Sequence, residues 1–138
     1  MRKSILTALA FVLVASMSLV SCGGDNGSPK ASKNDTPKDV LEKALNAMKN
    51  KDYKGVIAFV IDAESASEEE VNELASVLEF SDQLTGGIKD FSITRESIDD
   101  DGQTASVYAD IVYNNGEEDK DDVTMFMLTD KGWRMSLD

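Results

Sequence analysis

The chain lacks the residues on which most nucleophilic and metal-dependent enzymes rely. Its 138 residues contain no histidine and a single cysteine, Cys22. These absences exclude Ser-His and Cys-His catalytic pairs, histidine-ligated metals and multi-cysteine zinc sites. They also exclude an internal disulfide, so the folded part has to be stable through its hydrophobic core alone. We therefore expect neither a metal nor a cofactor.

Basic residues are scarce as well. The chain has 14 Lys and Arg against 26 Asp and Glu, a formal net charge of −12. Such a surface repels nucleic-acid phosphates and anionic lipid headgroups, so nucleic acid is not an expected partner. The carboxylates at 99–101 lack the ligand spacing of an EF-hand loop, and nothing fixes a metal's geometry at 117–122.

The N-terminus has the layout of a secretory signal. Arg2 and Lys3 precede an apolar run over residues 5–14, which is short for a membrane span, and small residues then lead to Cys22. The ending Leu19-Val20-Ser21-Cys22 resembles the bacterial lipobox. The resemblance implies cleavage between Ser21 and Cys22, with fatty acyl chains such as palmitate added to Cys22. The alternative is an ordinary signal peptide whose cysteine happens to lie there.

This interpretation divides the chain into three parts. We expect a signal peptide over 1–21, a lipidated cysteine with a flexible tether over 22–35, and one domain over 36–138. Residues 23–35 are rich in Gly, Ser and Asn, as in a linker. The predicted location is the cell envelope, bound to the membrane through the lipid. Gly23 in place of Asp after the cysteine favours the outer over the inner membrane.

Helical signals fill the first half of the domain. Thr36 and Pro37 begin a helix with an apolar stripe, and Asp52 opens a short second one. Ser67 and Glu70 form a capping box, and Gly86 ends a third amphipathic helix. The apolar positions expected to face the core in the third helix are Val71, Leu74, Ala75, Val77, Leu78 and Leu84.

Alternating patterns from residue 88 onward predict strands. Glycine is third in each of three connections, 100–102, 114–116 and 130–132, which favours three-residue hairpin loops. That loop length fixes the register and pairs Phe91 with Ile111, Ile93 with Ala109 and Val107 with Val123. It also pairs Ala105 with Met125, Met127 with Met135 and Met125 with Leu137, and all these paired residues are expected on the core-facing side of the sheet. The expected fold is α+β: three helices packed on a four-stranded antiparallel, bent meander sheet, with a cone-like, cystatin-like architecture.

Several stretches, in this order, resemble a known group. They are residues 36–45, 51–53, 88–93, 104–107 and 131–135. The chain resembles small bacterial lipoproteins of unknown function that carry a nuclear-transport-factor-2-like (NTF2-like) domain, related in fold to polyketide-cyclase and lumazine-binding-like families. The resemblance implies a bent sheet wrapped around the long helix. It implies no functional residue.

Two groups of side chains are candidate sites. The small Ala105 and Ala109, near Trp133, either line a pocket in the cone or make room for the indole. Tyr108, Phe126 and Leu128 fall on the predicted outer sheet face, where a homodimer would form; the alternative is scattered surface apolar residues.

The favoured function is a lipid-anchored, non-catalytic envelope module that binds a protein partner or a small apolar ligand. One alternative is an enzyme of the cyclase or isomerase type, with a buried carboxylate such as Asp62 or Asp110 as its acid or base. The other is a purely structural surface lipoprotein.

Overall fold

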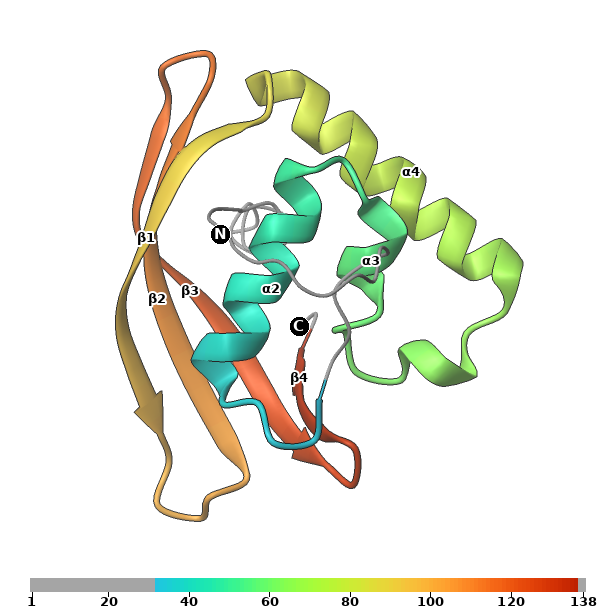
Figure 1. The fold of residues 1–138 in the computed structure, drawn as a ribbon, viewed down its shortest axis with the longest axis vertical. Helices are drawn as coiled ribbons and strands as arrows, with labels where there is room; N and C mark the ends of the chain where they lie inside the picture. The colour runs from blue at the N-terminus through green and yellow to red at the C-terminus, as the bar shows by residue number, and fades with distance from the viewer. Residues whose placement is uncertain (1–31, 137–138) are drawn as a thin grey trace, which may run out of the picture.

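The computed structural model describes residues 32–136. The described residues do not include the predicted signal peptide with Ser21, nor Cys22 and most of the predicted tether. Three α-helices precede four strands, and the strands form one antiparallel sheet in the order β1-β2-β3-β4. Figure 1 shows α2 lying across one face of a curved sheet, with α4 farther from it. This is the predicted α+β fold.

Helix α2 (Pro37–Lys49) begins where the sequence predicts. Thr36 accepts a hydrogen bond from the Asp39 N–H, and the Asp39 carboxylate accepts one from the Thr36 N–H. This reciprocal cap satisfies two donors that a helix start leaves unpaired. The predicted stripe is fully buried and forms the centre of the core: Val40, Leu41, Ala44, Leu45 and Met48.

Helix α3 (Tyr53–Ile57) is short and leads the chain to the edge of the sheet. Asp52 caps its first turn through the Gly55 N–H. Val60 then forms a parallel bridge with Met135 of β4, and the Phe59 carbonyl accepts from the Met135 N–H. The segment after α3 therefore covers part of the edge that β4 would otherwise expose. A 3₁₀ turn, η2 (Ala63–Ser65), leads on towards α4.

The first hairpin joins β1 (Ile88–Ile98) to β2 (Thr104–Tyr113). The predicted pairs Phe91–Ile111 and Ile93–Ala109 are confirmed. The loop is one residue longer than predicted, because the Asp99 N–H bonds to the Thr104 carbonyl. A register shift between Ile93 and Arg95 offsets the extra loop residue, which is why the predicted pairs hold beyond it.

The second hairpin joins β2 to β3 (Glu118–Thr129), and the register predicted for most of this pair is wrong. The three-residue loop is present, and Ile111 lies opposite Asp119 as that loop requires. One extra residue then enters β3 at Asp121, whose φ is 53°. Val107 consequently pairs with Thr124, and Ala105 with Phe126. A shift of one residue exchanges the two faces of a strand, so the predicted inward placement of Met125 and Met127 is wrong.

The last hairpin, to β4 (Gly132–Met135), also differs from expectation. Thr129 pairs with Gly132, so the loop has two residues rather than three. Met135 therefore lies opposite Phe126 and not opposite Met127, while Trp133 lies opposite Leu128. The predicted pair of Met125 with Leu137 falls outside the described residues. The Met125 carbonyl accepts a hydrogen bond from the Ser136 N–H.

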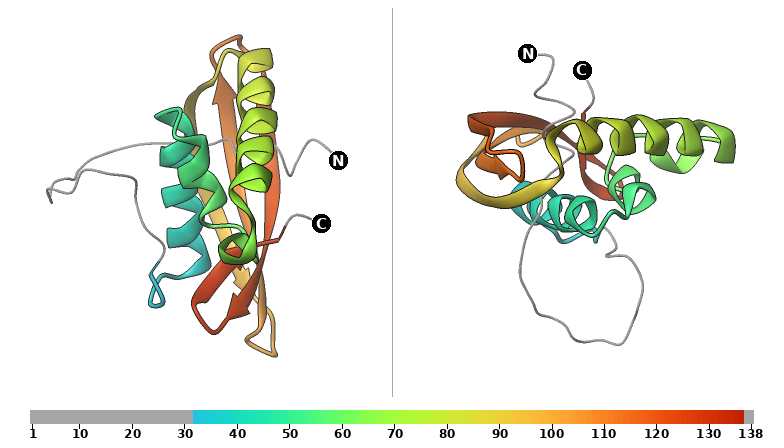
Figure 2. Two further views of the ribbon diagram at one scale, coloured as in Figure 1. Left: turned by 90° about the vertical axis from the view of Figure 1, so that its right-hand side faces the viewer. Right: turned by 90° about the horizontal axis from the view of Figure 1, so that it is seen from above.

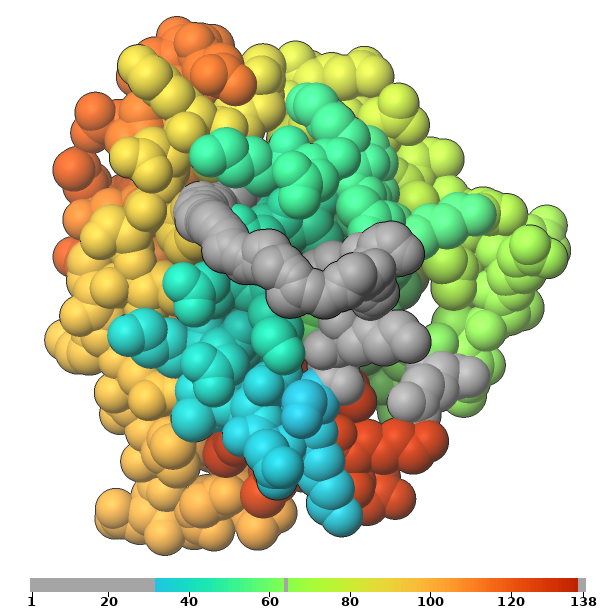
Figure 3. All heavy atoms as spheres, viewed as in Figure 1, coloured from blue at the N-terminus to red at the C-terminus, as the bar shows by residue number. Residues whose placement is uncertain are grey.

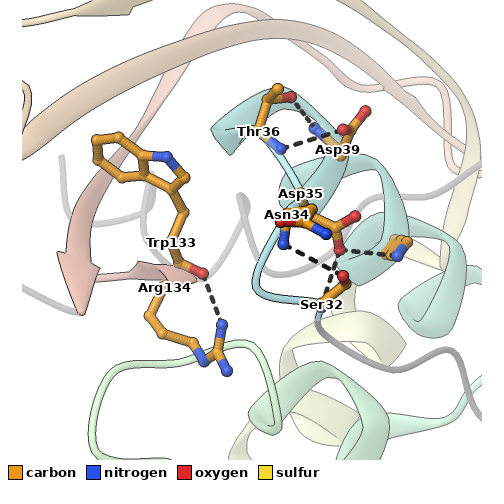
Figure 4. A network of polar contacts seen from close by, with 8 residues as sticks. Ser32, Asn34, Asp35, Thr36, Asp39, Trp133 and Arg134 are labelled. Atoms are coloured by element: carbon orange, nitrogen blue, oxygen red, sulfur yellow. Dashed lines mark hydrogen bonds and ion pairs between the residues drawn. The ribbon is translucent and has the colours of Figure 1, made fainter. Parts of the chain in front are cut away.

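The last four residues of the predicted tether form a turn on the domain (Figure 4). The Asp35 carboxylate accepts from the Ser32 N–H and forms an ion pair with Lys43, at 2.7 Å. A Cβ on Gly132 would lie 3.0 Å from the Lys33 Cα, so this turn lies against the start of β4. Within residues 32–136, no helix is long and apolar enough to cross a membrane.

Candidate interaction site on helix α4

Helix α4 (Glu68–Thr85) is strongly defined by its sequence. The Ser67 hydroxyl accepts from the Glu70 N–H, and the Glu70 carboxylate accepts from the Ser67 N–H. Glu68, Glu69 and Glu70 favour its positive end. Gly86, with a φ of 78°, ends the helix in the left-handed conformation that favours glycine.

Only part of the apolar surface of α4 is buried. Leu78 is buried, and Val71 and Ala75 pack against the core. The main neighbour of α4 is α3, and Figure 2 shows the helix extending away from the rest of the domain. The sequence predicts one core-facing side that includes Leu74, Val77 and Leu84, and this prediction is wrong. These three, together with Phe80, are exposed.

The exposed apolar residues form a continuous line, which we call the α4 stripe: Leu74, Val77, Phe80 and Leu84. Their spacing of three and four residues places them on one side of the helix. At about 100° per residue, the stripe is centred about 130° from the buried side. Phe80 is 64% exposed and Leu84 is 66% exposed. An apolar line with no partner in the described fold is typical of an interaction site.

A buried carboxylate fixes α4 to the rest of the helical layer. Asp82 is 2% exposed, and one of its oxygens lies 2.7 Å from the Lys51 Nζ and 2.8 Å from the Tyr53 hydroxyl. A Cβ on Gly87 would lie 3.1 Å from the same Nζ, so glycine leaves room for the lysine. These contacts join α4 to Lys51, in the turn between α2 and α3, and to Tyr53, the first residue of α3.

The same contacts change the chemistry of Tyr53. Burial raises the pKa of its hydroxyl above the ordinary value of 10.0, and the hydrogen bond to Asp82 raises it further. Both effects disfavour a phenolate, because burial deprives the charge of water and Asp82 would repel it. Tyr53 is therefore a stable neutral donor.

The predicted pocket residues lie on the inner side of the sheet. Ala105 and Ala109 are buried on β2, and Trp133 is buried on β4. Ala105 lies in line with Phe126 and Met135 across three strands, and both of these side chains are fully buried. Whether Ala105, Ala109 and Trp133 line a pocket stays a prediction.

The predicted sheet-face group is divided by the extra residue in β3. Phe126 is 1% exposed and belongs to the core, so its predicted outer placement is wrong. Leu128 lies on the inner side, opposite Trp133, and is partly exposed. Tyr108 does lie on the outer side. The Arg95 guanidinium lies over its ring, with the Arg95 Cζ 3.9 Å from the ring centroid. Met125 and Met127 join it there, and a dimer through this face stays a prediction.

Neither of the two carboxylates considered for catalysis is buried, so the prediction of a buried acid or base at these positions is wrong. Asp62 is exposed, with a φ of 63°, at the start of η2. Asp110 lies on the outer sheet face, and its carboxylate accepts from the Asp121 N–H at 2.8 Å. It thereby satisfies the backbone of the extra residue in β3. Among residues 32–136, no cluster of three or more acidic, histidine or cysteine side chains could hold a metal ion.

Comparison with solved structures supports the fold. A crystal structure from Campylobacter jejuni, of a protein provisionally named an NTF2-like transpeptidase, matches with a TM-score of 0.55. The match covers 75% of this chain and all of the other, at 18% identity. The chain therefore has an NTF2-like fold. No protein-family model matches it, and no curated protein matches it.

The sequence predicts α4 itself but not the exposure of its apolar stripe. The signal was present, because apolar residues occupy more than half of the helix's circumference, which is wider than one packed side needs. Leu78 and Leu84 look equivalent in the sequence, and only the position of α3 distinguishes them.

Proposed function

We propose that this NTF2-like domain is a non-catalytic binding module of the cell envelope, held at the membrane through lipid on Cys22. Its working surface is the α4 stripe, and its ligand is a segment of a partner protein. The single observation that carries this proposal is the exposure of Phe80 and Leu84 on a helix whose other side is firmly packed. Exposed apolar side chains that follow one side of a helix are typical of a surface that a partner covers.

The sequence supports the location and the lack of catalysis. The lipobox-like ending at Cys22 would place the domain within a short linker of the membrane, where partners are also anchored or secreted. Reactions that depend on histidine or on a second thiol have no residue to perform them. The transpeptidase name of the Campylobacter protein is not extended to this chain, because the two share the fold alone.

Photo-crosslinking tests the proposal. A photoreactive amino acid replaces Phe80 in the full-length protein, expressed in the cells that naturally make it. A matched probe replaces Asn72, which is exposed on another side of α4. We expect a discrete adduct from position 80 that is absent from position 72 and lost when Leu84→Gln is added. Equal adducts from both positions would contradict the proposal.

A further inference from the structure

The charges on α4 have a single sign. The helix carries six carboxylates and no lysine or arginine. Within residues 32–136, Asp82 is the one carboxylate of the six that forms an ion pair, and its partner is Lys51. Glu70 is engaged by the Ser67 cap. Glu69 and Glu73 are exposed and have no basic partner among residues 32–136.

These carboxylates are placed asymmetrically about the stripe. At about 100° per residue, Glu73 falls within the width of the α4 stripe and Glu69 falls at its margin. Both precede Leu74 and therefore lie at the N-terminal end of the stripe. Glu79 falls on another side of the helix, and no charged residue of α4 follows Leu84. The surface thus has an acidic end and an apolar end.

This pattern argues against two other occupants. Anionic lipid would be repelled by a helix with no basic residue, whereas interfacial helices usually carry lysine and arginine on their polar side. A second copy of α4 would bring more carboxylates to the contact and no basic residue to offset them.

We propose that the occupant is a basic amphipathic helix of a partner protein; this inference rests on the proposed function and adds the chemistry of the ligand. Its apolar side chains, spaced i, i+3, i+4 and i+7, would pack on Leu74, Val77, Phe80 and Leu84. Lysines or arginines at one end would lie over Glu69 and Glu73. The asymmetry of charge fixes the direction in which the helix docks.

Two synthetic peptides test this inference with the purified full-length protein. Both carry leucines at i, i+3, i+4 and i+7; one has lysines at one end and the other has glutamates there. Binding is measured by fluorescence anisotropy. We expect the lysine peptide to bind at least about tenfold more tightly than the glutamate peptide, because like charges at a contact cost more than a neutral pair.

Variants locate the contact. Glu69→Gln with Glu73→Gln should weaken the lysine peptide about fivefold, as expected for two exposed ion pairs. Glu79→Gln removes an equal charge from another side of α4 and should change the affinity less than twofold. Phe80→Ser should weaken both peptides by more than about tenfold. Circular dichroism confirms that each variant is folded, since all four positions are exposed.

The outcomes separate the inference from the proposed function. If both peptides bind equally and Phe80→Ser abolishes both, or if neither binds while the cellular adduct at position 80 forms, the basic-helix inference is overturned and the proposed function stands. If Glu79→Gln weakens binding as much as the Glu69 and Glu73 changes do, the attraction is nonspecific and the inference fails. A dimer in sedimentation that Phe80→Ser dissociates would assign the stripe to a second copy and overturn it as well.

Discussion

At the scale of single residues, Asp82 determines how α4 is held against the rest of the domain. Its carboxylate is almost completely buried, yet its partner Lys51 keeps 59% of its side chain exposed. The burial of the carboxylate is compensated by one charge and one phenolic donor. The contact lies on the side of α4 away from the stripe, so it positions the stripe without being part of it.

Replacing Asp82 should loosen the helix. Asp82→Ala removes the acceptor of the half-buried Tyr53 hydroxyl, and we expect a loss of about 2 kcal/mol in the free energy of unfolding. Urea denaturation of the purified protein measures it. The control Glu79→Ala, an exposed position on the same helix, should change stability by less than about 0.5 kcal/mol. Equal effects of the two changes would show that the buried contacts contribute nothing.

The raised pKa of Tyr53 predicts a pH dependence. An unfolded tyrosine ionises near pH 10, whereas Tyr53 in the fold keeps its proton to higher pH. Its contribution to stability is therefore complete below about pH 10 and is lost as the pH rises further. The stability difference between the parent and Tyr53→Phe should shrink from about pH 8 to about pH 10.5. Parallel stability curves across that range would contradict the shift.

At the scale of elements, the sequence predicts which segments form and is less informative about their register. Thr36 and Ser67 cap the starts of α2 and α4, and Gly86 ends α4. The chemistry of these caps is local, so the sequence predicts these three helix ends. The extra residue that shifts the register of β3 is Asp121. It is not a glycine, so the sequence does not indicate a positive φ at this position. Asp adopts a positive φ more readily than most residues, but nothing in the local pattern requires it to do so.

The outcome at each candidate site follows from this distinction. Ala105, Ala109 and Tyr108 lie on β2, and their predicted sides are correct because the extra residue is in the neighbouring strand. Phe126 lies beyond Asp121 on β3, and its predicted side is wrong for the same reason. The exposure of Phe80 depends on the packing of α4 against α3, which no local pattern encodes.

The extra residue in β3 should be essential to the sheet. Deleting Asp121 would turn Phe126 outward and Met125 inward, so we expect a loss of several kcal/mol or failure to fold. Asp121→Gly keeps the extra residue and accepts a positive φ, so it should stay within about 1 kcal/mol of the parent. Circular dichroism and urea denaturation measure both. A deletion variant as stable as the parent would show that the register shift is unimportant.

At the scale of the whole molecule, a packed NTF2-like domain carries one helix that is incompletely covered. Figure 3 shows α2 and α3 forming much of one face, with α4 at its margin. Such an arrangement leaves the core intact while the α4 stripe stays exposed, which is the surface that the proposed partner would cover. Lipid on Cys22, as proposed, would hold that surface in the envelope.

The proposed lipid anchor predicts that a variant without Cys22 changes its location and keeps its fold. Cys22→Ala removes the thiol that a diacylglyceryl group requires, so the variant should leave the membrane fraction and appear in the soluble envelope fraction. Immunoblotting of separated fractions measures the shift. Ser28→Ala, in the predicted linker, is the matched control and should remain membrane-bound. A Cys22→Ala protein that stays with the membrane would contradict lipid attachment.

The central claim, that a partner covers the α4 stripe, is tested most directly by the reactivity of an introduced cysteine. Because lipid would occupy Cys22, Phe80→Cys and Asn72→Cys each provide a single free thiol. Both should react readily with a maleimide in the purified protein. In the native envelope, we expect position 80 to react at least about fivefold more slowly and position 72 to be unchanged. Equal reactivity of position 80 in the envelope and in the purified protein would contradict the claim.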